Sequence, residues 1–254
     1  MKKDIHHYCR VYDNFLSPDM CEEYIRLYED TLKYEAQKVM DLSVCYVNGK
    51  KVCGDCNCMR LNPMEYDQFH ELNTIAINKF SDVIHQYKID VDMHPAQWPD
   101  QYGYEELRIK RFLIEGVDEF NEKQNPYGNN NYHGLNYHVD IYSHAHAKRF
   151  LCLMIYLNDD FDQGETYFPI FQSGVKPKQG SIFLFPPQWT FLHSGNRPLA
   201  PSKHMAKYFL MTHTNYIDMS KVNSGTNFSD RTERHNDPNV LNIDTKQLSW
   251  PSNG

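Results

Sequence analysis

The chain has 254 residues, of which 41% are hydrophobic and 14% aromatic, and its formal net charge at pH 7 is −7. This length and apolar content suffice to bury a core, which excludes general disorder and favours one composite domain. The negative charge argues against a nucleic-acid binder, and no apolar run approaches the roughly 18 residues of a membrane span.

The N-terminal decapeptide, MKKDIHHYCR, has no apolar segment after its lysines, so no secretory signal is expected. Seven cysteines are an odd number, which argues against a complete set of disulfides. Reduced thiols and a cytoplasmic location are therefore expected.

Residues 1–104 are expected to form a helical and hairpin support region. A short strand is predicted at 8–12, followed by a helix with Ser17 as N-cap and Pro18 at its first position. Apolar residues at helical spacing predict a second helix over 64–86.

Between these helices, residues 43–61 predict a β-hairpin with an Asn-Gly turn at 48–49. The hairpin carries cysteines at a spacing that could form part of a thiolate zinc site: Cys45, Cys53, Cys56 and Cys58. Structural zinc sites usually have two separated pairs of ligands, so free thiols in a loop remain the alternative.

Residues 105–216 change to short β-rich runs separated by Gly, Pro, Asn and Asp. Seven such runs are LRIKRFLI, LNYHVDIY, KRFLCLMIYLN, GETYFPIF, GSIFLFP, WTFLHSG and KYFLMTHTNY. Without helical segments between them, they predict a sandwich, a barrel or a jelly roll. A polar loop is predicted at 115–136, and residues 217–254 form a polar C-terminal tail.

Three side chains at the ends of these runs are candidate metal ligands. His138 and Asp140 are two positions apart in an extended segment, so they point to the same side, and His193 ends another run. Two imidazoles and one carboxylate can hold Fe(II) with open coordination positions, and the same set can hold Zn(II). Each residue alone could equally be a surface strand or turn residue. Five further histidines are not assigned as ligands: His133, His144, His146, His204 and His213.

A lysine follows in the last run, which is otherwise apolar. Lys207 would be costly to bury without an anion, and an anionic ligand held at one end by the metal would supply that partner.

In this order the motifs resemble the prolyl 4-hydroxylase-like branch of the iron(II)- and 2-oxoglutarate-dependent dioxygenases, including its shorter bacterial and phage members. The resemblance rests on the segments His138-Val-Asp140, Ile155-Tyr-Leu-Asn158, Gly164-Glu-Thr166, Gly180-Ser181, His193-Ser-Gly195 and Lys207-Tyr208. It extends more weakly to Asp13-Asn-Phe-Leu-Ser17 and the helix after it.

The resemblance implies an α+β fold with a mainly β core, a double-stranded β-helix (jelly roll) flanked by N-terminal helices. It implies Fe(II) on His138, Asp140 and His193, with 2-oxoglutarate and O₂ as cosubstrates and ascorbate as a supporting reductant. Lys207 would pair with the distal carboxylate of 2-oxoglutarate, with hydroxyl groups from Tyr156 and Thr166 nearby.

Two departures from the family pattern bear on the cosubstrate. Lys207 follows His193 at a longer interval than the family usually has, so Lys203 or Arg197 could be the anchor instead. Phe112 stands where many relatives have a tyrosine that contacts the cosubstrate.

The resemblance implies hydroxylation of an unactivated C–H bond, because the carboxylate that halogenating relatives lack is present as Asp140. The first expectation is a prolyl residue of a peptide or protein, held between the hairpin and the 115–136 loop against aromatic walls from Tyr132, Tyr137, Tyr142 and Trp189. The alternatives are a small-molecule or other side-chain hydroxylase, or a non-catalytic or zinc-binding β-sandwich module. The bacterial and phage relatives suggest the cytoplasm of a bacterium or of a virus-infected host cell.

Overall fold

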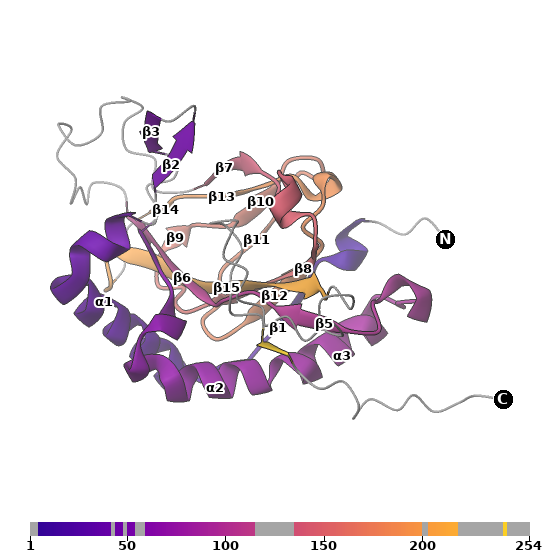
Figure 1. Ribbon diagram of the computed structural model, residues 1–254, viewed down its shortest axis with the longest axis horizontal. Helices are drawn as coiled ribbons and strands as arrows, with labels where there is room; N and C mark the ends of the chain where they lie inside the picture. The colour runs from indigo at the N-terminus through magenta and orange to yellow at the C-terminus, as the bar shows by residue number, and fades with distance from the viewer. Residues whose placement is uncertain are drawn as a thin grey trace, which may run out of the picture.

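A layer of helices, a large sheet and a small sheet lie on top of one another in this chain (Figure 1). The computed structural model describes residues 5–41, 44–47, 50–53, 59–114, 135–199, 203–217 and 241–242. The predicted α+β fold with a mainly β core is confirmed by this arrangement.

The larger sheet is built around the long strand β15 (Ala206–Tyr216). One edge of β15 pairs with β8 (Arg149–Tyr156), and the other edge pairs with β6 (Arg108–Leu113) and then β5 (Tyr102–Tyr104), all antiparallel. Among the described residues the sheet has eight strands, the others being β1 (Arg10–Tyr12), β4 (Met59–Leu61), β12 (Ile182–Phe185) and β16 (Leu241–Asn242).

The smaller sheet has the order β11-β10-β13-β7, which does not follow the order of these strands in the chain. Its strands are β7 (Leu135–His138), β10 (Thr166–Phe168), β11 (Ser173–Val175) and β13 (His193–Gly195). Two short pairs complete the β structure of the described segments: β2 (Val44–Val47) with β3 (Lys50–Cys53), and β9 (Asp162–Gln163) with β14 (Pro198–Leu199). Each of the seven predicted β-rich runs contains a strand.

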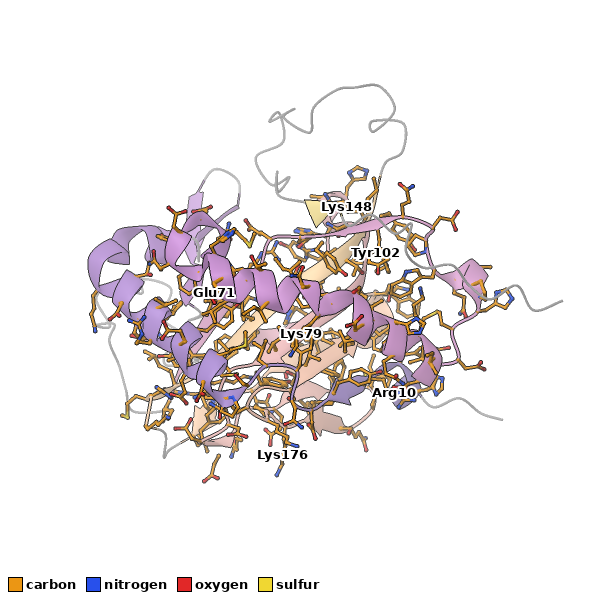
Figure 2. All side chains as sticks on the ribbon, turned by 90° about the horizontal axis from the view of Figure 1, so that it is seen from below. Arg10, Glu71, Lys79, Tyr102, Lys148 and Lys176 are labelled. Carbon is orange, nitrogen blue, oxygen red and sulfur yellow. The ribbon has the colours of Figure 1, made fainter. Side chains whose placement is uncertain are left out.

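The helical layer consists of α1 (Pro18–Asp41), α2 (His70–Asn78) and α3 (Phe80–Asp90), which lie across the outer face of the larger sheet (Figures 1 and 2). The predicted start of α1 is confirmed, because the Met20 N–H donates to Ser17 Oγ at 3.3 Å. The prediction of one helix over 64–86 is wrong. Two 3-10 turns, η2 (Pro63–Glu65) and η3 (Asp67–Phe69), come first, and Lys79 separates α2 from α3 because its N–H bonds only three residues back, to Ala76.

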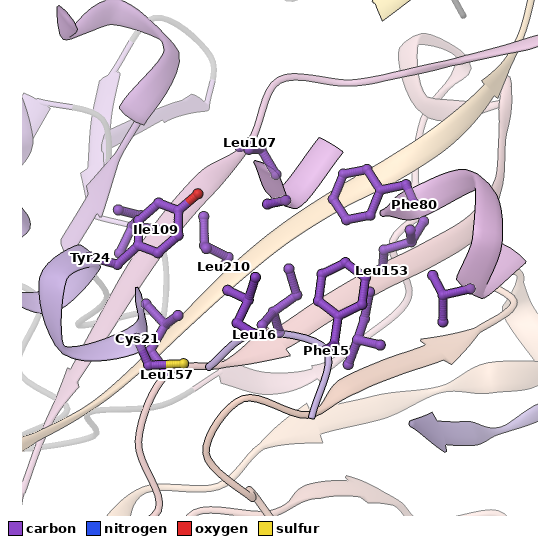
Figure 3. Packing of buried hydrophobic residues seen from close by; sticks show 14 of the residues in the cluster. Phe15, Leu16, Cys21, Tyr24, Phe80, Leu107, Ile109, Leu153, Leu157 and Leu210 are labelled. Atoms are coloured by element: carbon purple, nitrogen blue, oxygen red, sulfur yellow. The ribbon is translucent and has the colours of Figure 1, made fainter. Parts of the chain in front are cut away.

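Strands β8, β12 and β15 of the larger sheet are buried on both faces, and their residues alternate between two cores. The helix-facing core contains mainly aliphatic strand residues, namely Ile109, Leu151, Leu153, Ile155, Ile182, Leu184 and Leu210. Figure 3 shows several of these against Phe15, Leu16, Cys21, Tyr24 and Phe80 of the N-terminal region. The core between the two sheets is richer in aromatic and sulfur-containing side chains, namely Phe112, Cys152, Met154, Tyr156, Phe168, Phe183, Phe185, Phe191, Phe209 and Met211.

Several predicted features lie outside the described residues. The β2–β3 pairing confirms the hairpin strands, but its turn at 48–49 and Cys56 and Cys58 of the possible zinc site are not described. The same holds for residues 115–134 of the polar loop, including Tyr132, and for most of the tail. Within the described part of the chain, no helix combines the length and apolar character needed to cross a bilayer.

Three further 3-10 turns connect strands near the smaller sheet or the helices. They are η4 (Pro95–Gln97), η6 (His144–His146) and η7 (Trp189–Phe191). The last of these leads directly into β13 and therefore sets the position of His193.

Candidate metal centre

The three predicted ligand residues meet at one end of the smaller sheet. His138 is the last residue of β7 and His193 the first residue of β13, and the antiparallel register places them directly opposite each other, with ring centroids 4.3 Å apart. Asp140 lies two residues beyond the end of β7, and its Oδ1 is 3.7 Å from His138 Nε2. One donor atom from each of the three residues falls within 4.8 Å of the others.

His193 has the protonation state that a ligand needs. Its Nδ1 lies 3.0 Å from the Phe191 carbonyl, which can only accept, so Nδ1 carries the proton and Nε2 keeps its lone pair. Burial lowers the pKa of His193 to about 4, even though the nearby Asp140 carboxylate acts in the opposite direction. The imidazole is therefore neutral at pH 7.

Asp140 is a buried carboxylate with its negative charge retained. Burial alone would raise its pKa, but His213, with smaller contributions from His193 and His138, holds the pKa of Asp140 well below its ordinary value. Its Oδ2 is buried and has no hydrogen-bond partner among the described residues. An ionised carboxylate beside two imidazoles is a donor set that fits a divalent metal ion.

His213, which we did not predict as part of the site, lies next to the carboxylate of Asp140. Its Nε2 is 3.1 Å from Asp140 Oδ2, and its side chain is only 1% exposed. The sequence did contain a signal: Lys207, Phe209, Met211 and His213 are spaced by two along β15, so they all face the space between the sheets. Cys152 joins this group, but burial raises the pKa of its thiol well above the ordinary value, so it is a poor metal ligand at neutral pH.

Lys207 lies in the same pocket as the three predicted ligands. Its side chain is 1% exposed, and its Nζ donates to the Gly164 carbonyl at 2.6 Å. The rings of Phe112, Tyr156 and Phe209 surround the ammonium at 5.2–5.7 Å from their centroids. A positive charge is thus held inside the molecule, facing the same cavity as the metal-type donors.

The two alternative cations lie elsewhere. Lys203 is exposed and its Nζ pairs with Glu22 Oε1 of α1 at 2.8 Å, and the Arg197 guanidinium donates to the Ile114 carbonyl at 3.1 Å. Neither is among the residues that line the pocket. Lys110 of β6, which we did not predict, does line it, with its Nζ 5.8 Å from the centre of the Phe209 ring.

Thr166 and Tyr156 form a buried pair beside Lys207. Their hydroxyl oxygens are 2.8 Å apart, and either group can be the donor. Thr166 lines the pocket, whereas Tyr156 reaches it through Thr166. If Tyr156 donates, the threonine hydroxyl keeps its own proton, which points to the weak acceptor Met154 Sδ at 3.6 Å and can turn to a ligand.

Three exposed aromatic side chains lie close to the ligand residues along the chain. Tyr137 precedes His138, Tyr142 follows Asp140, and Trp189 belongs to the turn that leads to His193. Their exposed fractions are 59%, 74% and 78%. Of the four predicted aromatic walls, these three are described and lie in segments directly flanking the ligand residues.

Comparison with protein-family models and with curated proteins gives no match. Solved structures similar in fold include two prolyl hydroxylases. One is a viral collagen prolyl hydroxylase from Paramecium bursaria Chlorella virus-1 in complex with 2OG, at 17% identity and a TM-score of 0.51, covering 83% of this chain and 97% of that one. The other is a prolyl hydroxylase from Trichoplax adhaerens in complex with a peptide of a hypoxia-inducible factor, at 13% identity and a TM-score of 0.50, covering 87% and 88%. The resemblance to the prolyl 4-hydroxylase-like branch is thus confirmed at the level of the fold.

Proposed function

We propose that this protein is an Fe(II)- and 2-oxoglutarate-dependent dioxygenase that hydroxylates a prolyl residue of a peptide or protein. The observation that carries the proposal is the convergence of His138, Asp140 and His193 in one pocket with the buried Lys207. The fold shared with prolyl hydroxylases supports it, and the proposal includes the assignment of the two sheets as a double-stranded β-helix.

The metal would be held by His138, Asp140 and His193. Two neutral imidazoles and one carboxylate on one side of a divalent ion leave positions open for other ligands, a pattern typical of Fe(II) oxygenases. Zn(II) accepts the same donors. The cation across the pocket favours iron, because a zinc site has no need of an anchor for a dicarboxylic acid.

Lys207 would bind the distal carboxylate of 2-oxoglutarate. Its ammonium is buried among three aromatic rings, so an anion that enters the pocket meets a charge that little water screens. Thr166 would donate its hydroxyl to the same carboxylate, while Tyr156 donates to Thr166 and fixes its orientation. In this proposal Tyr156 acts on the cosubstrate through Thr166.

The iron centre, when loaded, would supply the activation of O₂, with one oxygen atom entering succinate and the other the hydroxylated product while CO₂ leaves. The chain's own residues provide the surroundings. Phe112, Met154, Phe209 and Met211 line the pocket with apolar surface, which keeps bulk water from the reacting groups. Phe112 offers no hydroxyl, so the cosubstrate contacts come from Lys207 and Thr166.

A proline-rich peptide is the proposed substrate because of the exposed aromatic side chains at the entrance. Tyr137, Tyr142 and Trp189 are 59–78% exposed on segments that flank the ligand residues. Aromatic surfaces bind polyproline II segments well, since such segments are already extended and lose little conformational entropy on binding.

The test is a turnover assay with purified protein, Fe(II), 2-oxoglutarate, ascorbate and a panel of proline-containing peptides in air. Succinate should form, and mass spectrometry should find one added oxygen atom on proline. Succinate formation together with hydroxylation of a free amino acid or nucleobase, and of no peptide, would keep the dioxygenase but reject the substrate. Tight Zn(II) binding without any consumption of 2-oxoglutarate would favour the binding module instead.

A further inference from the structure

A network of buried charged residues contacts Asp140 of the candidate metal centre and lies outside the lining of the pocket. Its members are Glu105, Arg108, Arg149 and His213, each no more than 9% exposed. They come from the segment before β6, from β6 itself, from β8 and from β15, so the network exists only in the folded sheet.

Glu105 is the centre of this network. Arg149 pairs with both of its carboxylate oxygens, Nε with Oε1 at 2.6 Å and Nη2 with Oε2 at 2.8 Å, and Arg108 adds a third contact at 2.8 Å. Burial would raise the pKa of Glu105, but His213, Arg149 and Arg108 hold it well below its ordinary value. Glu105 is therefore a fixed anion with two fixed guanidinium partners.

Two arms run from Glu105 to Asp140. The Arg149 Nη1 donates to the main-chain carbonyl of Asp140 at 2.8 Å, so one arm holds the backbone of this residue. His213 forms the other arm: its Nδ1 is 3.4 Å from Glu105 Oε2 and its Nε2 is 3.1 Å from Asp140 Oδ2. Neither ring nitrogen has a hydrogen-bond partner among the described residues, so a small movement of the ring or of a carboxylate is needed to form one.

The two oxygens of Asp140 thus have different neighbours. Oδ1 is the oxygen on the side of His138, at 3.7 Å, and Oδ2 is the oxygen on the side of His213. When His213 Nε2 engages Oδ2, Asp140 can offer Oδ1 to a metal as a single donor, which leaves more coordination positions for ligands.

We propose that Glu105, Arg149 and His213 form a clamp that positions Asp140 to bind the metal through Oδ1 alone. This inference rests on the proposed function, in which Asp140 is a metal ligand. The clamp residues are positioning residues, since they contact Asp140 and are not among the residues that line the pocket. Replacing such supporting partners commonly weakens metal binding about 10- to 100-fold.

The experiment measures Mn(II) affinity of the full chain by calorimetry, without substrate or turnover, in five variants. His213→Leu removes one arm, Arg149→Lys keeps the charge but shortens the other arm, and His213→Gln restores a donor near the Nε2 position. Asp140→Ala is the reference for a lost ligand. Thr214→Val is the matched control, because Thr214 is fully buried on the same strand, faces the opposite side and donates its hydroxyl to the Leu151 carbonyl at 3.4 Å.

The expected result is a dissociation constant raised about 10- to 100-fold by His213→Leu and by Arg149→Lys, with much of the loss recovered in His213→Gln. The visible absorption of the Co(II)-loaded protein should change in His213→Leu, because the donor geometry changes. Thr214→Val should lower the melting temperature and leave both the affinity and the Co(II) spectrum as in the wild type. A purely structural network would give this control pattern in all the clamp variants.

The Asp140→Ala variant distinguishes a failure of the clamp from a failure of the proposed metal centre. Wild-type affinity in a folded His213→Leu protein, with binding abolished by Asp140→Ala, would overturn the clamp and leave the proposed function intact. If His213→Leu does not fold, wild-type affinity in Arg149→Lys overturns the clamp in the same way. Undiminished Mn(II) binding by Asp140→Ala would remove Asp140 from the metal site and reject the clamp and the proposed centre together.

Discussion

The two faces of the larger sheet are formed by the same strands, but one face packs against the helices and the other contributes to the candidate site. On β8, Leu151, Leu153 and Ile155 pack against the helices, while Cys152, Met154 and Tyr156 face the smaller sheet. On β15, Tyr208 and Leu210 belong to the helix side, and Lys207, Phe209 and His213 to the other side. One chain segment therefore supplies stability through one set of alternate residues and the candidate site through the other.

The difference lies in the polar groups that each face buries. The helix-facing core is mainly hydrocarbon and aromatic rings, and the buried guanidinium on this face, Arg111, pairs with Glu29 of α1 at 3.2 Å. The face toward the smaller sheet buries an ammonium, a carboxylate and imidazoles, which need partners to offset their loss of water. Those partners are the network behind Asp140 on one side and, we propose, bound metal and cosubstrate on the other.

The sharpest test of this contrast is His193→Ala, which removes one predicted ligand from the site face. Turnover of 2-oxoglutarate should be abolished, because two remaining ligands cannot hold the metal in place, while the far-ultraviolet circular dichroism spectrum stays unchanged. Succinate formation is the measurement. Turnover at the wild-type rate in a folded His193→Ala protein would remove His193 from the site.

The next largest effect is expected from Lys207→Met. Losing one partner of a buried charge pair costs about 2–5 kcal/mol, so the KM for 2-oxoglutarate should rise on the order of 30- to 4,000-fold, with Mn(II) affinity little altered. Lys203→Met is the matched control, since Lys203 is an exposed lysine outside the pocket, and its KM should not change. The opposite pattern would make Lys203 the anchor.

On the helix-facing side, Leu153→Ala should act on stability alone. Leu153 is 1% exposed within the aliphatic core, and truncating such a residue lowers the free energy of unfolding by about 2–5 kcal/mol. Urea unfolding followed by fluorescence measures this loss. The KM for 2-oxoglutarate of the folded variant should match the wild type, and a rise as large as that in Lys207→Met would show that the two faces are not separable.

The smallest effect is expected from Trp189→Ala at the entrance. A lost aromatic contact is worth about 0.5–1.5 kcal/mol, so the KM for a proline-rich peptide should rise about 2- to 10-fold. Consumption of 2-oxoglutarate without peptide should stay constant, because Trp189 is 78% exposed and outside the pocket lining. An unchanged peptide KM would contradict the proposed aromatic wall.

Sequence periodicity determined most of the secondary structure of this protein. Alternation and turn residues located every predicted strand run, and the Ser17 cap located the start of α1, because these features depend on neighbours along the chain. The same periodicity wrongly predicted one continuous helix over 64–86. The apolar spacing continues through Lys79, but the backbone turns more tightly at this residue and separates α2 from α3. Periodicity records which residues face the core and is insensitive to a single short turn.

For the site, the sequence supplied the candidate ligands and left the choice among cations open. His138, Asp140 and His193 could be chosen because their residue types suit a metal and they end β-rich runs. Lys207, Lys203 and Arg197 are all basic residues within a short stretch, and only the folded chain separates the lysine that faces the pocket from one that pairs with Glu22 on α1.

Tertiary structure alone decided the register and the buried network. The pairing of β7 with β13 sets His138 opposite His193, and the packing of β5, β8 and β15 brings Glu105 and Arg149 to His213 and Asp140. No local pattern encodes these contacts, because cross-strand neighbours depend on which strands pair and in which register. The sequence by itself thus identified the candidate metal ligands, and the pairing of the strands determined which side chains surround them.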